Sequence, residues 1–218
     1  MHDNPAAQAE LDALGLEVLP VVILPDGRSL VVGHVAQLRE FLGMPPEEAK
    51  PWHELVDAAE RVLMAFEILL TQLPDAHITD PTPNRGRDMR NMTVNIFSLM
   101  EELIVTMDTG HFSYQAHKDH DKKSVEYTRV SQLQTYAKDA RRRWAARARL
   151  VTADETEALV TTDRKGDLTQ YLALDAGARH AAGHLLQAYQ FLRQLGIEPA
   201  EPMTREEMKP IQVQESLY

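Results

Sequence analysis

Two histidines, His180 and His184, lie four residues apart in the stretch RHAAGHLLQAYQFLRQLGIEP, residues 179–199. Residues four apart on an α-helix share one face, so both imidazoles can point at the same spot. Imidazole binds transition metals, and near neutral pH it accepts or gives a proton. Two histidines seldom hold a catalytic metal by themselves. The pair therefore requires a third ligand from elsewhere in the chain, or a role without a metal.

The composition narrows the chemistry that this pair can support. The chain has 218 residues, no cysteine and a formal net charge of -10. Without cysteine there is no thiolate ligand and no cysteine nucleophile, so thiol chemistry must use a thiol from outside the chain. The negative charge argues against nucleic acid and against an anionic membrane as partners. We interpret the basic run Arg141–Arg143 as the solvated side of a helix.

The sequence predicts a cytoplasmic protein. The N-terminal stretch MHDNPAAQAELDALG lacks the basic region and the apolar core of a signal peptide. No apolar run approaches the roughly 20 residues that a membrane span needs.

The elements that position the histidine pair are helices. Apolar residues recur at helical spacing in four segments, and two of these segments end at glycines, Gly110 and Gly196. We expect a mainly α fold in which residues 51–218 form a four-helix bundle, with sites built from facing helices. A polar loop is expected at 111–127 and an extended excursion at 151–169. The four helices are expected at 51–73, 88–109, 130–150 and 173–196.

Residues 1–43 have a different pattern. A short helix ending at Gly15 is followed by the apolar run VLPVVIL, which is typical of a strand buried on both faces. The turn PDGR and the run SLVVG predict a second strand, and HVAQLREFLGM predicts a helix. About 40 residues are too few for an independent core, so this segment should pack on the rest.

The last helix resembles a known family. A His-x3-His pair followed by Gln187 and an apolar helix ending in LRQLGIEP is similar to the last helix of the DinB-like four-helix bundles. The stretch LPDAHITDPTPNRGRDMRNMTVNIFSLMEELI resembles the loop and second helix of that family. The resemblance spans residues 51–200 and implies a metal-dependent enzyme that uses a thiol, such as a transferase or isomerase. The implied metal is zinc or nickel.

The family's metal site takes one histidine from the second helix and two from the last. In this sequence Asn95 stands at the first of these positions, and His180 and His184 at the other two. An amide oxygen is a poor ligand for zinc or nickel. Two arrangements are open: Asn95 weakly supports a metal held by the two histidines, or the metal is lost and Asn95 hydrogen-bonds an imidazole. We favour the second.

The N-terminal segment resembles the C-terminal half of the glutaredoxin and thioredoxin-like fold. The stretch ALGLEVLPVVILPDGRSLVVGHVAQLREFLG has that order of strand, turn, strand and helix. In that family the backbone before the proline pairs with the cysteine of glutathione, so the resemblance implies that Leu19 and Pro20 bind glutathione as an added strand. The alternative is a hairpin that packs on the bundle or pairs across a dimer.

Further charged residues are candidates for binding or catalysis. Arg87 and Arg90, at the start of the second helix, are candidates to grip carboxylates of glutathione or of an acidic substrate, or they form a solvated surface. Glu101 and Glu102 are candidate bases, although ion pairing is the simpler interpretation. His53 is a candidate third ligand and otherwise a capping residue. A further stretch is dense in histidine and aspartate: His111, His117, Asp119, His120 and Asp121. Its spacing can bind a metal, although we expect a solvated loop, which can also act as a lid.

These observations lead to three hypotheses about function. The first is a glutathione-dependent transferase, isomerase or lyase that acts on a small electrophile, in which His180, His184 and Asn95 form the catalytic site. The second is a non-catalytic small-molecule binding or resistance protein on a bundle that has lost its metal. The third is a metalloenzyme that needs no thiol and uses His180, His184 and a further ligand. A homodimer is expected in each case.

Overall fold

The structure of the chain is a computed structural model, and it divides the chain into two compact units. One unit contains residues 1–47 and 164–166, and the other contains residues 48–163 and 167–218. The residues that the structure describes are 9, 11–15, 20–46, 48–83, 86–164 and 166–213.

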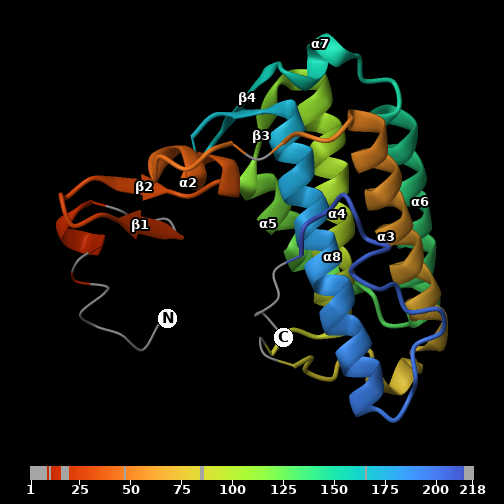
Figure 1. Cartoon of the computed structure of the whole chain (residues 1–218). Helices are drawn as coiled ribbons and strands as arrows, with labels where there is room; N and C mark the ends of the chain where they lie inside the picture. The colour runs from red at the N-terminus through yellow and green to blue at the C-terminus, as the bar shows by residue number, and fades with distance from the viewer. Residues whose placement is uncertain are drawn as a thin grey trace. The chain divides into compact units, whose positions relative to one another are not determined.

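The larger unit is a four-helix bundle. Its long helices α3 (Trp52–Gln72), α4 (Met89–Thr109), α6 (Val130–Ala148) and α8 (Gln170–Gln194) run side by side (Figure 1). Both α3 and α4 pack against α6 and α8. The core contains fully buried aromatic side chains, and the rings of Phe66 and Phe97 meet edge to face at 6.0 Å. The predicted mainly α four-helix bundle is thus confirmed.

Local sequence signals fix the ends of the two helices that carry the candidate site. Asp88 caps α4 by accepting a hydrogen bond from the backbone N–H of Asn91 at 2.8 Å. Gly110 ends α4 in the left-handed conformation, with φ of 70°. Thr169 caps α8, so the helix begins at Gln170, three residues before the predicted start at residue 173.

A glycine lets α4 and α8 approach each other beside the histidine pair. A Cβ atom on Gly177 would lie 2.7 Å from Cδ1 of Leu103, closer than such atoms normally come. Gly177 is one helical turn before His180, so this contact brings the His180 face of α8 towards α4.

A small sheet joins the start of α8 to the end of α4. Strand β4 (Leu159–Thr162) pairs in parallel with β3 (His111–Phe112) and antiparallel with β5 (Leu168–Thr169), in the order β3-β4-β5. The partners in register are His111 with Thr161 and Leu159 with Thr169. The connection between α6 and α8, which also contains α7 (Ala153–Thr156), is therefore tied to the segment after α4.

The segment predicted as a polar loop at 111–127 is mostly helical, so that prediction is wrong. After β3 it forms α5 (Tyr114–Lys122) and η2 (Lys123–Glu126), and α5 packs against α4. Ser113 caps α5 by accepting from the backbone N–H of Ala116 at 3.1 Å. The carboxylate of Asp163 accepts from the N–H groups of Tyr114 and Gln115 at 3.0 and 3.1 Å. These caps stabilise a helix that has no apolar stripe.

The smaller unit contains a hairpin and a helix. Strand β1 (Val21–Ile23) pairs antiparallel with β2 (Ser29–Val31) across a turn in which Gly27 has φ of 85°, and α2 (Val35–Phe41) follows. The strand β1 is half-buried along its whole length, so the prediction of burial on both faces is wrong. Part of the helix predicted before Gly15, and Leu19, lie outside the described residues.

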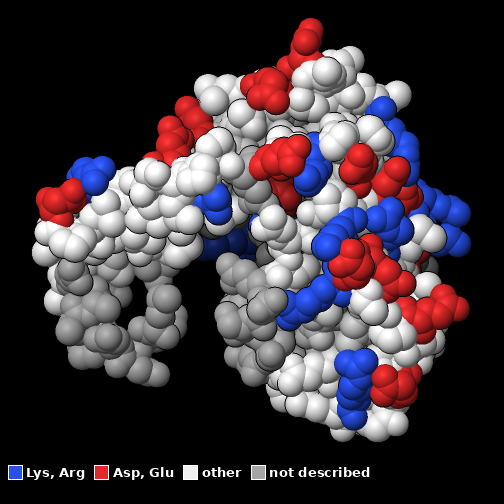
Figure 2. Space-filling view, viewed as in Figure 1, with Lys and Arg blue, Asp and Glu red and all other residues white. Residues whose placement is uncertain are grey.

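The surface of the bundle carries ion pairs between helices. Arg141 on α6 binds Glu60 and Glu67 on α3, at 2.7 and 2.6 Å, and its side chain is only 13% exposed. The interpretation of the whole run Arg141–Arg143 as solvated is therefore wrong for Arg141. Figure 2 shows Lys and Arg side chains interspersed with Asp and Glu over this face of the bundle. None of the helices among the described residues has the length and apolar character of a membrane span.

A short 3-10 helix, η1 (Asp75–His77), lies in the loop between α3 and α4. The carboxylate of Asp75 accepts from the backbone N–H of Val130 at 2.7 Å, which links this loop to the first residue of α6.

Candidate functional site

A buried amide, that of Asn95 on α4, joins three elements of the bundle. Its Oδ1 lies 2.7 Å from Nε2 of His180 on α8. Its Nδ2 lies 2.8 and 3.1 Å from the two carboxylate oxygens of Asp121 and 3.1 Å from Nε2 of His117, both on α5. Asn95 is 3% exposed, so these bonds form away from bulk water. We call Asn95, Asp121, His117 and His180 the amide network.

The hydrogen bonds of the amide network fix which ring nitrogens carry protons. A carboxylate only accepts, so the group that faces Asp121 is the NH2 of Asn95, and the oxygen of the amide faces His180. Nε2 of His180 therefore carries a proton and donates it to Oδ1 of Asn95. When His180 is neutral, its lone pair is on Nδ1.

His117 is held in the opposite tautomer. Its Nε2 accepts from the second N–H of Asn95, and its Nδ1 lies 3.1 Å from Oγ of Ser98, to which it donates. Burial lowers the pKa of His117, which the nearby Asp121 carboxylate opposes and the cations of Arg87 and His120 reinforce. His117 is accordingly a neutral hydrogen-bonding residue at neutral pH.

His184 lies behind His180, further into the bundle. The two rings are 4.4 Å apart between centroids and nearly perpendicular, at 87°. Nδ1 of His184 is 2.6 Å from Oε1 of Gln187, one turn along α8, so Nδ1 donates and the lone pair of the neutral ring is on Nε2. His184 is buried and His180 half-buried, so His180 is the member of the pair nearer to solvent.

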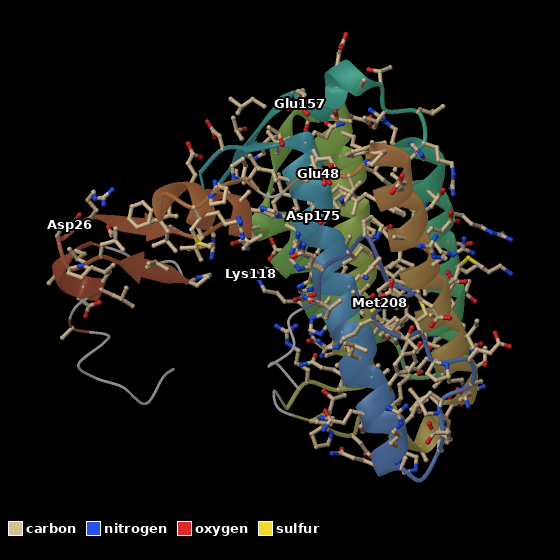
Figure 3. All side chains as sticks on the ribbon, in the orientation of Figure 1. Asp26, Glu48, Lys118, Glu157, Asp175 and Met208 are labelled. Carbon is tan, nitrogen blue, oxygen red and sulfur yellow. The ribbon has the colours of Figure 1, made fainter. Side chains whose placement is uncertain are left out.

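The structure places two residues of the predicted loop against α4, next to Asn95. His117 and Asp121 come from the stretch that was expected to be a solvated loop, and both are half-buried against α4. Lys118, labelled in Figure 3, marks the turn of α5 beside His117 and points away from the bundle. One signal was available: His117 and Asp121 are four residues apart, the same spacing as His180 and His184.

Other candidate residues lie apart from the amide network or have structural partners. His53 and His111 are exposed, and His111 pairs with Oγ1 of Thr161 at 2.9 Å. Glu102 accepts from the backbone N–H of Ser113 at 3.0 Å. Glu101 accepts from the Tyr136 hydroxyl at 2.8 Å and pairs with Arg143. The two glutamates thus have structural partners, a backbone N–H for Glu102 and an arginine for Glu101, as the ion-pair interpretation of these residues expects.

The cofactor-binding candidates differ in what they contact. Arg90 forms an ion pair with Asp88 at 2.6 Å, at the start of α4. Arg87 precedes that cap, and its cation is one of the charges that lower the pKa of His117, a member of the amide network. Leu19 is outside the described residues, and the carbonyl of Pro20 accepts from the N–H of Val32 at 2.9 Å within the hairpin. Glutathione binding along Leu19 and Pro20 stays a prediction.

The metal that the family resemblance implies does not fit this arrangement. Nε2 of His180 directs a proton at Asn95, and the amide of Asn95 offers N–H groups to Asp121 and His117, so hydrogen bonds use the positions a metal would need. Within the described ranges, no three His, Cys, Asp or Glu side chains are grouped so that they could hold a metal ion. The donor set thus fits a hydrogen-bonded network, with an amide where the family has its third imidazole.

Fold and site together define a class: a four-helix bundle with a long connection before its last helix and a polar site between facing helices. Solved structures share this fold. YfiT from Bacillus subtilis, a probable metal-dependent hydrolase with an unusual four-helix bundle topology, superimposes with a TM-score of 0.58 at 15% identity, over 71% of this chain and 94% of its own.

A second solved structure with this fold is the mycothiol-dependent maleylpyruvate isomerase. It gives a TM-score of 0.54 at 13% identity, over 65% of this chain and 61% of the isomerase, and a mutant of the same enzyme matches equally. The chain thus spans about three fifths of the isomerase. At these identities the likeness establishes the fold alone. No protein-family model and no curated protein matches the sequence.

Proposed function

We propose that this chain is a DinB-like enzyme that uses a low-molecular-weight thiol to isomerise or transfer a small electrophile. The observation that carries the proposal is the hydrogen-bonded chain from Asp121 through Asn95 to His180, with links of 2.8 and 2.7 Å. A base that is oriented by a second group, itself held by a third, is the arrangement that activates nucleophiles in many enzymes.

In this proposal His180 accepts the proton of the thiol. Its Nε2–H is held by Asn95, so Nδ1 is the basic nitrogen, and the Asp121 carboxylate stabilises the imidazolium through the amide. The S–H bond breaks, the proton moves to Nδ1, and the thiolate adds to an electrophilic carbon of the substrate. The imidazolium then returns the proton to the adduct or to the leaving group. His184, fixed by Gln187, packs against His180 and keeps its ring in place.

The absence of cysteine from the sequence supports an external nucleophile, because the chain itself supplies no thiolate. The thiol-dependent isomerase that shares the fold supports the same reaction class. Glutathione is our first candidate because of the resemblance of the N-terminal segment to half of a glutaredoxin, with Leu19 and Pro20 as its contacts. Mycothiol is the second candidate, since the isomerase depends on it.

Calorimetry with glutathione and with mycothiol tests this function. We expect one of them to bind the wild-type chain, and we expect His180→Gln to abolish thiol-dependent consumption of a panel of small electrophiles. His53→Gln, a matched change at an exposed histidine, should leave both binding and turnover intact. Absence of heat with either thiol up to millimolar concentration would contradict the proposal.

The same experiment separates the other hypotheses. Thiol or electrophile binding without turnover would favour a non-catalytic binding or resistance protein. Turnover that needs added zinc or nickel and no thiol would favour a metalloenzyme that uses His180 and His184.

A further inference from the structure

One nitrogen of the Arg87 guanidinium, Nη1, is buried and has no hydrogen-bond partner among the described residues. Among the described residues, four buried side-chain nitrogen or oxygen atoms have no hydrogen-bond partner, and Nη1 of Arg87 is the one that belongs to a charged side chain. A buried guanidinium nitrogen without an acceptor is costly, and such an atom in a native structure calls for an explanation.

Two carboxylates are candidates to pair with Arg87: Asp88, its neighbour in sequence, and Asp121 of the amide network. Both already accept hydrogen bonds from other groups. Asp88 receives Nε and Nη2 of Arg90 at 3.0 and 2.6 Å and also caps α4. Asp121 receives the NH2 of Asn95 with both of its oxygens. Among the described residues, the fold therefore pairs Arg90 with Asp88 and gives Nη1 of Arg87 no acceptor.

The backbone at Arg87 is held in place. Its carbonyl accepts from both the N–H and the hydroxyl of Thr82, at 2.6 and 2.7 Å, and Thr82 is buried. The residue that follows, Asp88, is the cap of α4. The backbone of Arg87 is thus anchored by Thr82, and the charge of its side chain contributes to the lowered pKa of His117. A cation held in advance at a half-buried position is suited to bind an anion.

We infer that Arg87 forms a carboxylate-binding subsite beside the amide network, so that the ligand of this site carries a carboxylate that pairs with Nη1 of Arg87. The planar fork of arginine matches a carboxylate with two parallel hydrogen bonds. This inference deepens the proposed function. It rests on that function in one respect: it assumes that the reaction occurs at the amide network. The carboxylate has two sources, the thiol or the electrophile.

Binding of simple carboxylates tests the subsite. The probes are fumarate, as a dicarboxylate without a thiol, and its dimethyl ester, as a neutral control, measured by calorimetry or by NMR titration. We expect fumarate to bind the wild type and the ester not to bind. Arg87→Gln should weaken fumarate at least about tenfold, since one charge-assisted hydrogen bond contributes that much or more. Arg87→Lys should bind fumarate with intermediate affinity, because it keeps the charge and loses the fork.

Arg142→Gln is the matched control. It makes the same charge change at an exposed position of α6 and should leave the affinity for fumarate unchanged. The melting temperature and the far-ultraviolet circular dichroism of each variant report whether it folds, and Arg87→Lys keeps the test valid if Arg87→Gln does not.

Two thiols distinguish the sources. If Arg87→Gln weakens glutathione and leaves cysteamine, a thiol without a carboxylate, unchanged, then the subsite binds the thiol. If it weakens fumarate alone, the subsite binds the electrophile. Failure of fumarate to bind the wild type, or equal binding of every carboxylate to wild type and Arg87→Gln, would overturn the inference. If the chain binds carboxylates through Arg87 but binds no thiol, the proposed function is contradicted and the carboxylate subsite is supported.

Discussion

At the scale of single residues, Asn95 determines the chemistry of the site. An amide donates through its NH2 group and accepts through its oxygen, so it can face a carboxylate on one side and a ring N–H on the other. A histidine at this position can offer a lone pair to a metal, and an asparagine links Asp121 to His180 instead. In the proposed function, this one residue therefore decides between a metal centre and a hydrogen-bonded base.

Replacing Asn95 by histidine should create a metal site. Asn95→His places a third imidazole where the family has one, opposite His180 and His184, and removes the amide links. We expect the affinity for zinc or nickel, measured by competition with a chelator, to rise at least about tenfold. The control is Asn91→His, one turn earlier on α4. Equal metal affinity in Asn95→His and wild type would contradict the placement of this residue opposite the pair.

The orientation of Asn95 depends on Asp121. In Asp121→Asn the carboxylate no longer selects the NH2 end of the amide, so His180 loses its fixed tautomer. We expect nitrogen NMR of His180 to change from a single Nε2–H form to a mixture. Thiol-dependent turnover should fall by at least about 100-fold, because the proposed base loses the group that fixes its tautomer. Asp119→Asn, an exposed change two residues earlier, serves as control. An unchanged His180 spectrum in Asp121→Asn would refute the assignment.

His117 makes stability depend on pH. Its pKa is below the ordinary histidine value of about 6.5 because burial disfavours the charged ring. As the pH falls below about 6.5, the unfolded chain binds a proton that the folded chain does not, so stability decreases until the lowered folded pKa is reached. Urea unfolding between about pH 7 and about pH 5 should show the wild type losing more stability than His117→Gln. Parallel profiles would exclude this role for His117.

At the scale of elements, periodicity predicted the long helices and missed α5. The four bundle helices have apolar residues every three or four positions, and this pattern is what core packing requires. Helix α5 is polar almost throughout, because it covers α4 with hydrogen bonds and caps rather than with an apolar face. Its stability depends on Asp163, about 50 residues away in sequence, which no local pattern reveals. The spacing of His117 and Asp121 could indicate that they share a helix face, but their contact with Asn95 depends on this long-range cap and could not be predicted from the sequence.

The link between α6 and α3 should be important for stability. Arg141, Glu60 and Glu67 are 13%, 17% and 18% exposed. Removing the arginine leaves the poorly solvated carboxylate of Glu67 without its partner, while Glu60 keeps its ion pair with Arg149. We expect Arg141→Ala to lower the free energy of unfolding by about 2 kcal/mol. Denaturant titration measures the change, with the exposed Arg142→Ala as the matched variant, for which about 0.5 kcal/mol or less is expected. Equal effects of the two variants would show that the buried link adds nothing.

At the scale of the whole molecule, the sequence predicted the bundle but only part of its site. His180, His184 and Asn95 were assigned through the spacing of two histidines and a family resemblance, and the structure brings them together on α4 and α8. His117 and Asp121 needed the fold, because their contacts join residues 22 and 26 positions from Asn95. The resemblance of residues 1–43 to half of a glutaredoxin stays a prediction.

The proposed function requires the amide network to activate a thiol that the chain does not contain. The ionisation of a bound thiol tests this claim directly, because a chain without cysteine contributes no thiolate absorbance of its own. Glutathione or mycothiol is titrated with pH in the presence of saturating protein, with the S-methylated thiol as the blank. We predict that the bound thiol ionises well below its usual pKa of about 8.5, and that His180→Gln removes this shift. A bound thiol that ionises as it does in free solution would contradict the account.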